Sequence, residues 1–176
     1  MILRKYRLFI RSQAGFTLLE ILAALAISAF IGVAVTMANV QILNQTSENN
    51  NYTACSRNTL NALHWIGRDA QGAQIMEGMA GFPEADDLVL SWTEWDNTHH
   101  QIVYSVVNGQ LLRNYSTDGG ASSEMLVAEY INPSSALTNC TSDNGVLILT
   151  ITASVGEGNS AVSVTKVREI TSRANL

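Results

Sequence analysis

The chain has 176 residues, enough for one modest domain together with a long helix. Fifteen acidic side chains outnumber ten lysines and arginines, which gives a formal net charge of −5. Nucleic-acid binding is driven by neutralisation of phosphates, so this balance, with no basic cluster after residue 15, argues against nucleic acid as the main partner.

The chain starts with a basic segment, and a long apolar segment follows it. Phe16–Ala38 covers about 23 positions, which is long enough to cross a bilayer as a helix. By the positive-inside rule the basic end stays in the cytoplasm. Four cations lie within residues 1–15: Arg4, Lys5, Arg7 and Arg11.

Glu20 is the only ionisable residue in the apolar segment. A carboxylate inside a membrane span costs about 2.5–3.5 kcal/mol on insertion scales, so its presence predicts a specific partner. Cleavage between Gly15 and Phe16 would supply that partner, because the new α-amino group of Phe16 is a cation. The two residues lie four apart and can meet within one helix. Alternatively, the amine of one chain neutralises the Glu20 of its neighbour.

An ordinary cleaved secretory signal is the alternative for this region. Such a signal has a basic start, an apolar segment and a small-x-small cleavage site, for which Ala24-x-Ala26 or Ala26-x-Ser28 would serve. A charge within the apolar segment and a basic start of 15 residues both argue against it.

The run Gly15-Phe16-Thr17-Leu18-Leu19-Glu20 behind a basic leader resembles the class III signal of type IV pilins and type II secretion pseudopilins. The resemblance implies that a prepilin peptidase cuts after Gly15 and N-methylates Phe16, and that Glu20 acts in filament assembly. It also implies a single-pass protein of the inner, cytoplasmic membrane with an extracytoplasmic head, which then enters a pilus or pseudopilus filament. The implied partners are other pilin or pseudopilin subunits, the membrane and an inner-membrane assembly platform.

The two cysteines, Cys55 and Cys140, are more than eighty residues apart. Outside the cytoplasm a disulfide between them would stabilise the fold by about 4 kcal/mol in the chain-entropy model. Two buried thiols are the alternative.

A second amphipathic stretch follows a polar one. Asn39–Asn61 is rich in Asn, Gln, Ser and Thr, which are poor helix-interior residues, so we expect a weak section there. An apolar face with helical spacing then resumes, and Gly72 and Gly78 mark where it ends. This face comprises Leu60, Leu63, Ile66, Ala70 and Ala73, whereas Arg57, Arg68, Asp69 and Gln71 fall largely off it.

We therefore expect one long, partly interrupted helix from Phe16 to about Ile75. The predicted organisation is a cleaved leader at 1–15, a membrane or filament-core helix at 16–40, a polar continuation at 41–75 that packs on the head, and a β-sheet head at 76–176.

The remainder of the chain predicts strands. Asn108-Gly109 between two β-prone runs is a strong hairpin signal, and the segment around residues 156–159 predicts a second hairpin. A helix followed by mostly antiparallel strands is an α+β fold, with the apolar side of the sheet on the helix. The expected strands are Leu88–Thr93, Gln101–Val107, Gln110–Tyr115, Met125–Ile131, Val146–Ala153 and Ala161–Ile170.

Weaker similarities point to a subgroup. The segments 66–71, 111–113 and 126–131 resemble the PilW/PulJ-type group of minor pilins and pseudopilins. A major pilin is disfavoured, because nothing here resembles the disulfide-bounded C-terminal loop of many major subunits, and Cys140 lies well before the end of the sequence.

The sequence gives no support to a catalytic function. It contains no GxSxG, HExxH or phosphate-binding loop, so we expect no enzyme activity and no cofactor. His64 is expected to be a surface or packing residue, and the adjacent His99 and His100 point apart on an extended chain, so no metal is expected. Asp86-Asp87 and residues 118–120 lack EF-hand ligand spacing and predict solvated turns rather than a calcium site.

Trp92 and Trp95 are expected in the core and at the edge of the sheet. The expected contacts to other pilins or cargo are the loops 86–87, 96–100, 118–123 and 138–144. A protein of a different class, a signal-anchored extracytoplasmic binding protein that never polymerises, fits the same elements.

Overall fold

The computed structural model describes residues 15–118, 120–143, 146–156 and 161–171. It confirms the α+β class, because a single long helix, α1 (Leu18–Gly72), precedes strands that pair in antiparallel fashion. The chain forms two compact units, Met1–Gln45 and Thr46–Leu176. The strands are β1 (Ile75–Glu77), β2 (Leu88–Thr93), β3 (His99–Val107), β4 (Gln110–Thr117), β5 (Ser123–Ala128), β6 (Asn139–Asp143), β7 (Val146–Val155) and β8 (Val162–Thr171).

The expectation of a weak helical section in the Asn-rich segment is wrong, since α1 runs through it without a break. Side chains there bond to carbonyls one turn back: Thr53 Oγ1 donates to Asn49 O at 2.8 Å, and Asn58 Nδ2 to Ala54 O at 3.0 Å. Asn58 Oδ1 also accepts the backbone N–H of Glu129 at 2.8 Å. Local propensity is a weak preference that such contacts override.

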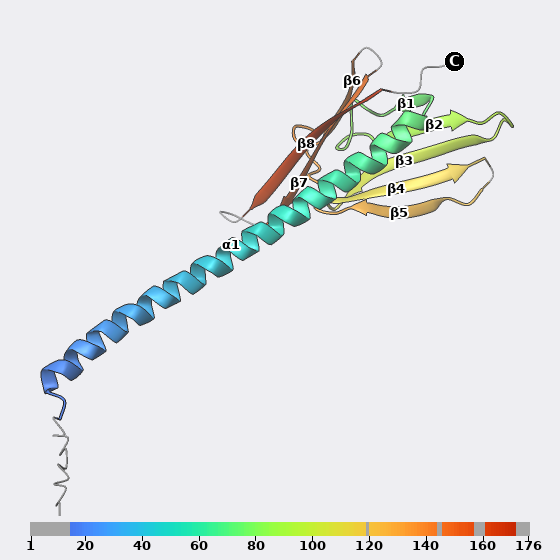
Figure 1. Ribbon diagram of the computed structural model, residues 1–176. Helices are drawn as coiled ribbons and strands as arrows, with labels where there is room; N and C mark the ends of the chain where they lie inside the picture. Colours follow the sequence, from blue (N-terminus) through green and yellow to red (C-terminus); the bar gives the residue numbers. More distant parts are fainter. Residues whose placement is uncertain (1–14, 119, 144–145, 157–160, 172–176) are drawn as a thin grey trace, which may run out of the picture. The chain divides into compact units, whose positions relative to one another are not determined.

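The strands form two sheets rather than one. The larger sheet has the order β1-β2-β3-β4-β5 and the smaller has β6-β7-β8 (Figure 1). The β3–β4 hairpin turns at Asn108 and Gly109, both with positive φ (50° and 76°), as the Asn-Gly signal predicts.

The chain passes from the larger sheet to the smaller after β5. The predicted strand at 125–131 ends at Ala128, and the next residues pair with β7 instead. Ser154 N donates to Tyr130 O, and Asn132 N donates to Thr152 O, each at 2.8 Å. β1 and β6, which the sequence did not predict, extend one edge of each sheet.

The core of the head lies between the sheets and the part of α1 that begins at Thr46. Four of the five predicted apolar helix positions are buried, but Leu60 is 52% exposed. In Figure 1 this part of α1 lies against both sheets, and hydrogen bonds join it to each of them. The largest fully buried side chains of the strands are Leu88, Leu90, Ile102, Tyr104, Leu111, Leu147, Leu149, Ile151 and Ile170.

Asp69 was expected off the apolar face but is buried, 8% exposed. Its Oδ2 accepts the Tyr104 hydroxyl and Arg113 Nε, each at 2.6 Å, and its Oδ1 accepts two bonds from Arg68. The ring of Trp65 lies 4.0 Å from the Arg68 guanidinium carbon and 5.5 Å from that of Arg113. One carboxylate therefore fixes the helix to β3 and β4.

Candidate assembly site at the start of the helix

Glu20 lies in the first turn of α1, where it closes a reciprocal cap with Thr17. The Glu20 Oε2 atom accepts both the backbone N–H and the hydroxyl of Thr17, each at 2.9 Å. In return, Glu20 N donates to Thr17 Oγ1 at 3.3 Å, and Thr17 O accepts the first helical N–H, from Ile21, at 3.2 Å. This is a capping box, which satisfies N–H groups that a helix start leaves unpaired.

Through the capping box, Thr17 is a partner for Glu20 that is not a cation and that the charge of Glu20 alone does not predict. The sequence carries the signal, a threonine three residues before a glutamate at the start of an apolar run. A carboxylate at this end is also favoured by the positive end of the helix dipole. The cost of placing a carboxylate in the apolar segment is therefore partly offset within the chain itself.

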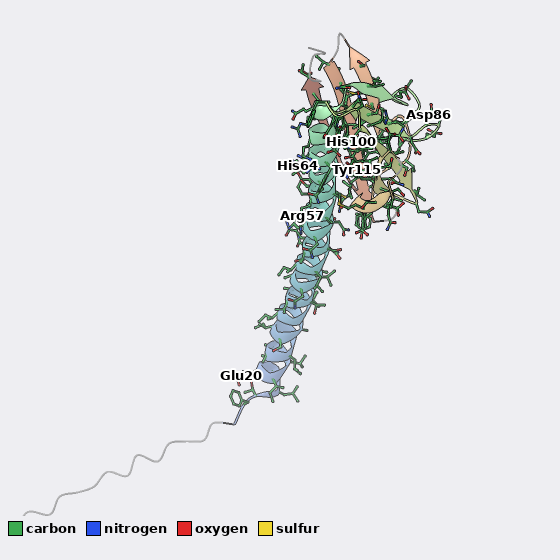
Figure 2. The ribbon with its side chains drawn as sticks, turned by 90° about the vertical axis from the view of Figure 1, so that its right-hand side faces the viewer. Glu20, Arg57, His64, Asp86, His100 and Tyr115 are labelled. Carbon is green, nitrogen blue, oxygen red and sulfur yellow. The ribbon has the colours of Figure 1, made fainter. Side chains whose placement is uncertain are left out.

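The capping box engages only one of the two carboxylate oxygens of Glu20. Among the described residues, hydrogen bonds reach only Oε2 of Glu20, and Oε1 has none. Phe16, 83% exposed, shares with Glu20 a shallow hollow of about 360 Å³ that extends along the helix to Ser28. The labelled Glu20 lies at the start of α1 (Figure 2). The arrangement leaves Oε1 available to an external cation.

The apolar surface of the helix has no cover within its own unit. Every side chain from Gly15 to Gln45 is exposed, although most of them are apolar. The helix is long and apolar enough to cross a membrane. Such a surface needs lipid or other protein around it.

Residues 10–36 match the family model of the prokaryotic N-terminal methylation motif. The chain carries a pilin-type signal. This confirms the resemblance to type IV pilins and pseudopilins, while the PilW/PulJ-type subgroup stays a prediction. Searches of curated proteins and of solved structures found no significant match.

The pilin-type signal has general consequences for this chain. It marks a pilin-like precursor that is processed and methylated, and it belongs to a structural rather than a catalytic family. It implies a membrane-anchored N-terminus, processing by a prepilin peptidase and assembly with other pilin subunits. The roles of Gly15, Phe16 and Glu20 as individual residues stay predictions.

The two cysteines do not form the disulfide considered above. Both are free and buried. Cys55 Sγ lies 3.4 Å from the carbonyl oxygen of Val162, and Val162 pairs with Val155 of β7. Cys140 pairs with Leu149, which is also on β7. Six residues of β7 separate these positions, on the order of 20 Å along a strand. Disulfide-bonded residues need Cα atoms within about 7 Å, so the alternative of two buried thiols describes the structure.

We expect the native chain to resist thiol labelling. Burial raises the pKa of the Cys140 thiol to about 12 and also raises the pKa of Cys55, so little thiolate is available at neutral pH. A maleimide should react slowly with the folded protein. In denaturant it should react with both cysteines even when no reductant is present. Mass spectrometry measures the adducts. Labelling in denaturant that appears only after a reductant is added would contradict the free thiols.

The other candidate residues are structural in this fold. His100 stacks on Trp92 with ring centroids 5.0 Å apart, and its Nδ1 lies 2.7 Å from the Tyr115 hydroxyl. Asp118 Oδ2 accepts the backbone N–H of His99 at 3.2 Å. His64 is exposed on α1, in edge-to-face contact with Trp65.

The two acidic segments that were weighed as calcium sites, Asp86-Asp87 and residues 118–120, lie in different connections of the head. Within the described ranges, no three His, Cys, Asp or Glu side chains gather in a metal-binding group. Gly119, which belongs to the second of these segments, lies outside the described residues. Trp95 does not pack at the edge of the sheet as expected, because its side chain is 94% exposed.

Proposed function

We propose that this protein is a structural subunit of a type IV pilus or type II secretion pseudopilus. Prepilin peptidase cleaves it after Gly15 and methylates Phe16, and the helix that follows packs with equivalent helices of other subunits. The observation that supports this most directly is a carboxylate, one of whose oxygens has no hydrogen bond from the described residues, in the first turn of an exposed apolar helix within the matched methylation motif.

In this proposal Glu20 and the Phe16 amine form a pair between neighbouring subunits. After cleavage the amine is a cation at the positive end of the helix dipole, an unfavourable place for positive charge. Oε1 of a neighbouring Glu20 neutralises it, while Oε2 keeps the cap with Thr17. Removal of both charges at once lets two apolar helices pack in a water-poor filament core.

The head then decorates the filament surface or caps its tip. We propose a minor subunit, supported by the similarity of residues 66–71 and 111–113 to PilW/PulJ-type proteins. The free thiols also support it, because no disulfide between them closes a loop of the kind seen in many major subunits. The segments 86–87 and 96–100, with 118–123 and 138–144, are the proposed contacts to other pilins or cargo. The last of them was expected to be a loop but is mostly strand β6, and His99 and His100 begin β3.

The mature amino terminus tests the proposal. Mass spectrometry of the membrane-extracted protein should find a chain that begins with N-methylated Phe16. A start near Ala26 or Phe30, or an intact Met1, would instead favour the signal-anchored binding protein and remove the pilin function.

A further inference from the structure

Trp95 is a large apolar side chain that an ordered turn holds in solvent. It lies in the β2–β3 connection with 94% of its surface exposed. Glu94 N donates to Thr98 O and Asn97 N to Glu94 O, each at 3.0 Å, and Asp96 Oδ1 accepts Thr98 N at 2.9 Å. Because the turn is already ordered, binding through Trp95 costs little conformational entropy. Tryptophan is among the residues most enriched at the energetic centre of protein interfaces.

The charges beside Trp95 restrict its partner. Glu94 and Asp96 flank it, both are exposed, and residues 93–98 include no Lys or Arg, while His100 Nε2 lies 3.5 Å from Glu94 Oε1. An acidic tip disfavours anionic lipid and nucleic acid. It favours an apolar pocket bordered by positive charge.

The head itself contains such a pocket, between α1 and β8. This groove is open to solvent and has a volume of about 640 Å³. Leu60 in its lining is 52% exposed, whereas Val167 borders the groove with its side chain on the opposite face of β8 from Lys166 and Arg168. Lys166 and Arg168 supply positive charge, and neither forms an ion pair with a carboxylate in the described part of the chain. The groove is lined by residues that include Leu60, Leu63, His64, Lys166, Val167 and Arg168.

The groove has a defined shape because Arg168 crosses the helix. Its Nη1 donates to Leu63 O at 3.2 Å, and its guanidinium lies against Gly67, where a Cβ would come within 2.9 Å of Nη1. The absence of a side chain at Gly67 gives the guanidinium room. One wall of the groove is thereby fixed as a cationic edge beside the exposed side chain of Leu60.

The tip and the groove do not meet within one molecule. Figure 1 shows the β2–β3 connection at the outer end of the larger sheet, whereas β8 lies in the other sheet, on the opposite side of α1. The two surfaces can therefore satisfy each other only between molecules.

We propose that Trp95 of one copy inserts into the α1–β8 groove of a second copy. The indole covers Leu60, and the carboxylates of Glu94 and Asp96 lie beside Lys166 and Arg168. The contact joins two different surfaces, so it is heterologous. It goes beyond the proposed function, because it assigns a head-to-head interface to any two copies of this subunit that are adjacent on the filament surface.

Photocrosslinking of the full-length chain in its membrane tests the contact. A donor chain carries p-benzoylphenylalanine in place of Trp95, which keeps an aromatic side chain at the tip, and a differently tagged acceptor is co-expressed. Illumination should give donor–acceptor dimers whose crosslinks map by mass spectrometry to residues 58–68 or 167–168 of the acceptor. The same probe in place of Leu126, which is exposed on β5, is the matched control and should not reach these peptides.

Charge reversal supplies the second arm. Lys166→Glu in the acceptor should lower the dimer yield roughly tenfold, and Glu94→Lys in the donor should restore it. Crosslinks from position 95 to other peptides, no dimer, or no effect of charge reversal would overturn the contact. Chains that begin with N-methylated Phe16 but give no groove crosslink would refute this interface and leave the proposed function standing. A different mature start would refute the proposed function whatever the crosslinks show.

Discussion

Filament incorporation is expected to be lost when Glu20 is replaced by alanine, although the leader is still removed after Gly15. The substitution leaves the Phe16 amine unneutralised at the positive end of a helix dipole, in surroundings where an unpaired charge costs about 2.5–3.5 kcal/mol. It also deletes the Glu20 side of the capping box with Thr17. The measurement is the fraction of mature subunit in sheared filaments, with processing followed by gel mobility. Normal incorporation of this variant would contradict the proposed pair between Glu20 and the Phe16 amine.

Two matched variants separate charge from capping. Glu20→Gln removes the charge, but its amide oxygen still accepts the N–H of Thr17, as glutamine does in natural capping boxes. Thr17→Ala keeps the charge and deletes the hydroxyl that closes the box. We expect Glu20→Gln to fail in assembly as fully as Glu20→Ala, and Thr17→Ala to assemble with a moderate loss. The reverse order would assign the role of Glu20 to helix capping.

Replacement of Asp69 by alanine is expected to lower the free energy of unfolding of the head by about 3–5 kcal/mol. The change leaves Arg113, whose side chain is 15% exposed, without its counter-charge and the buried Tyr104 hydroxyl without its acceptor. The full-length chain in mild detergent can be unfolded with urea and followed by tryptophan fluorescence, to which Trp65, beside both arginines, contributes together with Trp92 and Trp95.

Arg68→Ala is the matched control for Asp69→Ala. Arg68 bonds to the same carboxylate, but its side chain is 51% exposed, so we expect a loss of about 1 kcal/mol or less. Equal losses in the two variants would show that burial of the Asp69–Arg113 pair is not what stabilises the contact between α1 and the larger sheet.

Much of the fold follows from local patterns. The apolar run after Phe16 predicts a helix, Asn108-Gly109 predicts its hairpin, and alternating β-prone runs predict most strands. These signals work because they reside in neighbouring residues, where backbone preferences and side-chain periodicity act directly. The continuous helix through the Asn-rich segment was mispredicted, since propensities of a few tenths of a kcal/mol per residue are weak beside hydrogen bonds and packing.

The sequence by itself determined the spacing on which the proposed N-terminal site rests: Gly15 before the proposed cut, Phe16 as the proposed amine and Glu20 four residues later. All three lie within six residues, so spacing alone relates them. Only the tertiary structure placed Asp69 in the core, kept Cys55 and Cys140 apart, and left Trp95 exposed on one side of the head and the α1–β8 groove on another. Those outcomes depend on the pairing of strands far apart in the chain and on the path of one helix across two sheets, which no local pattern encodes.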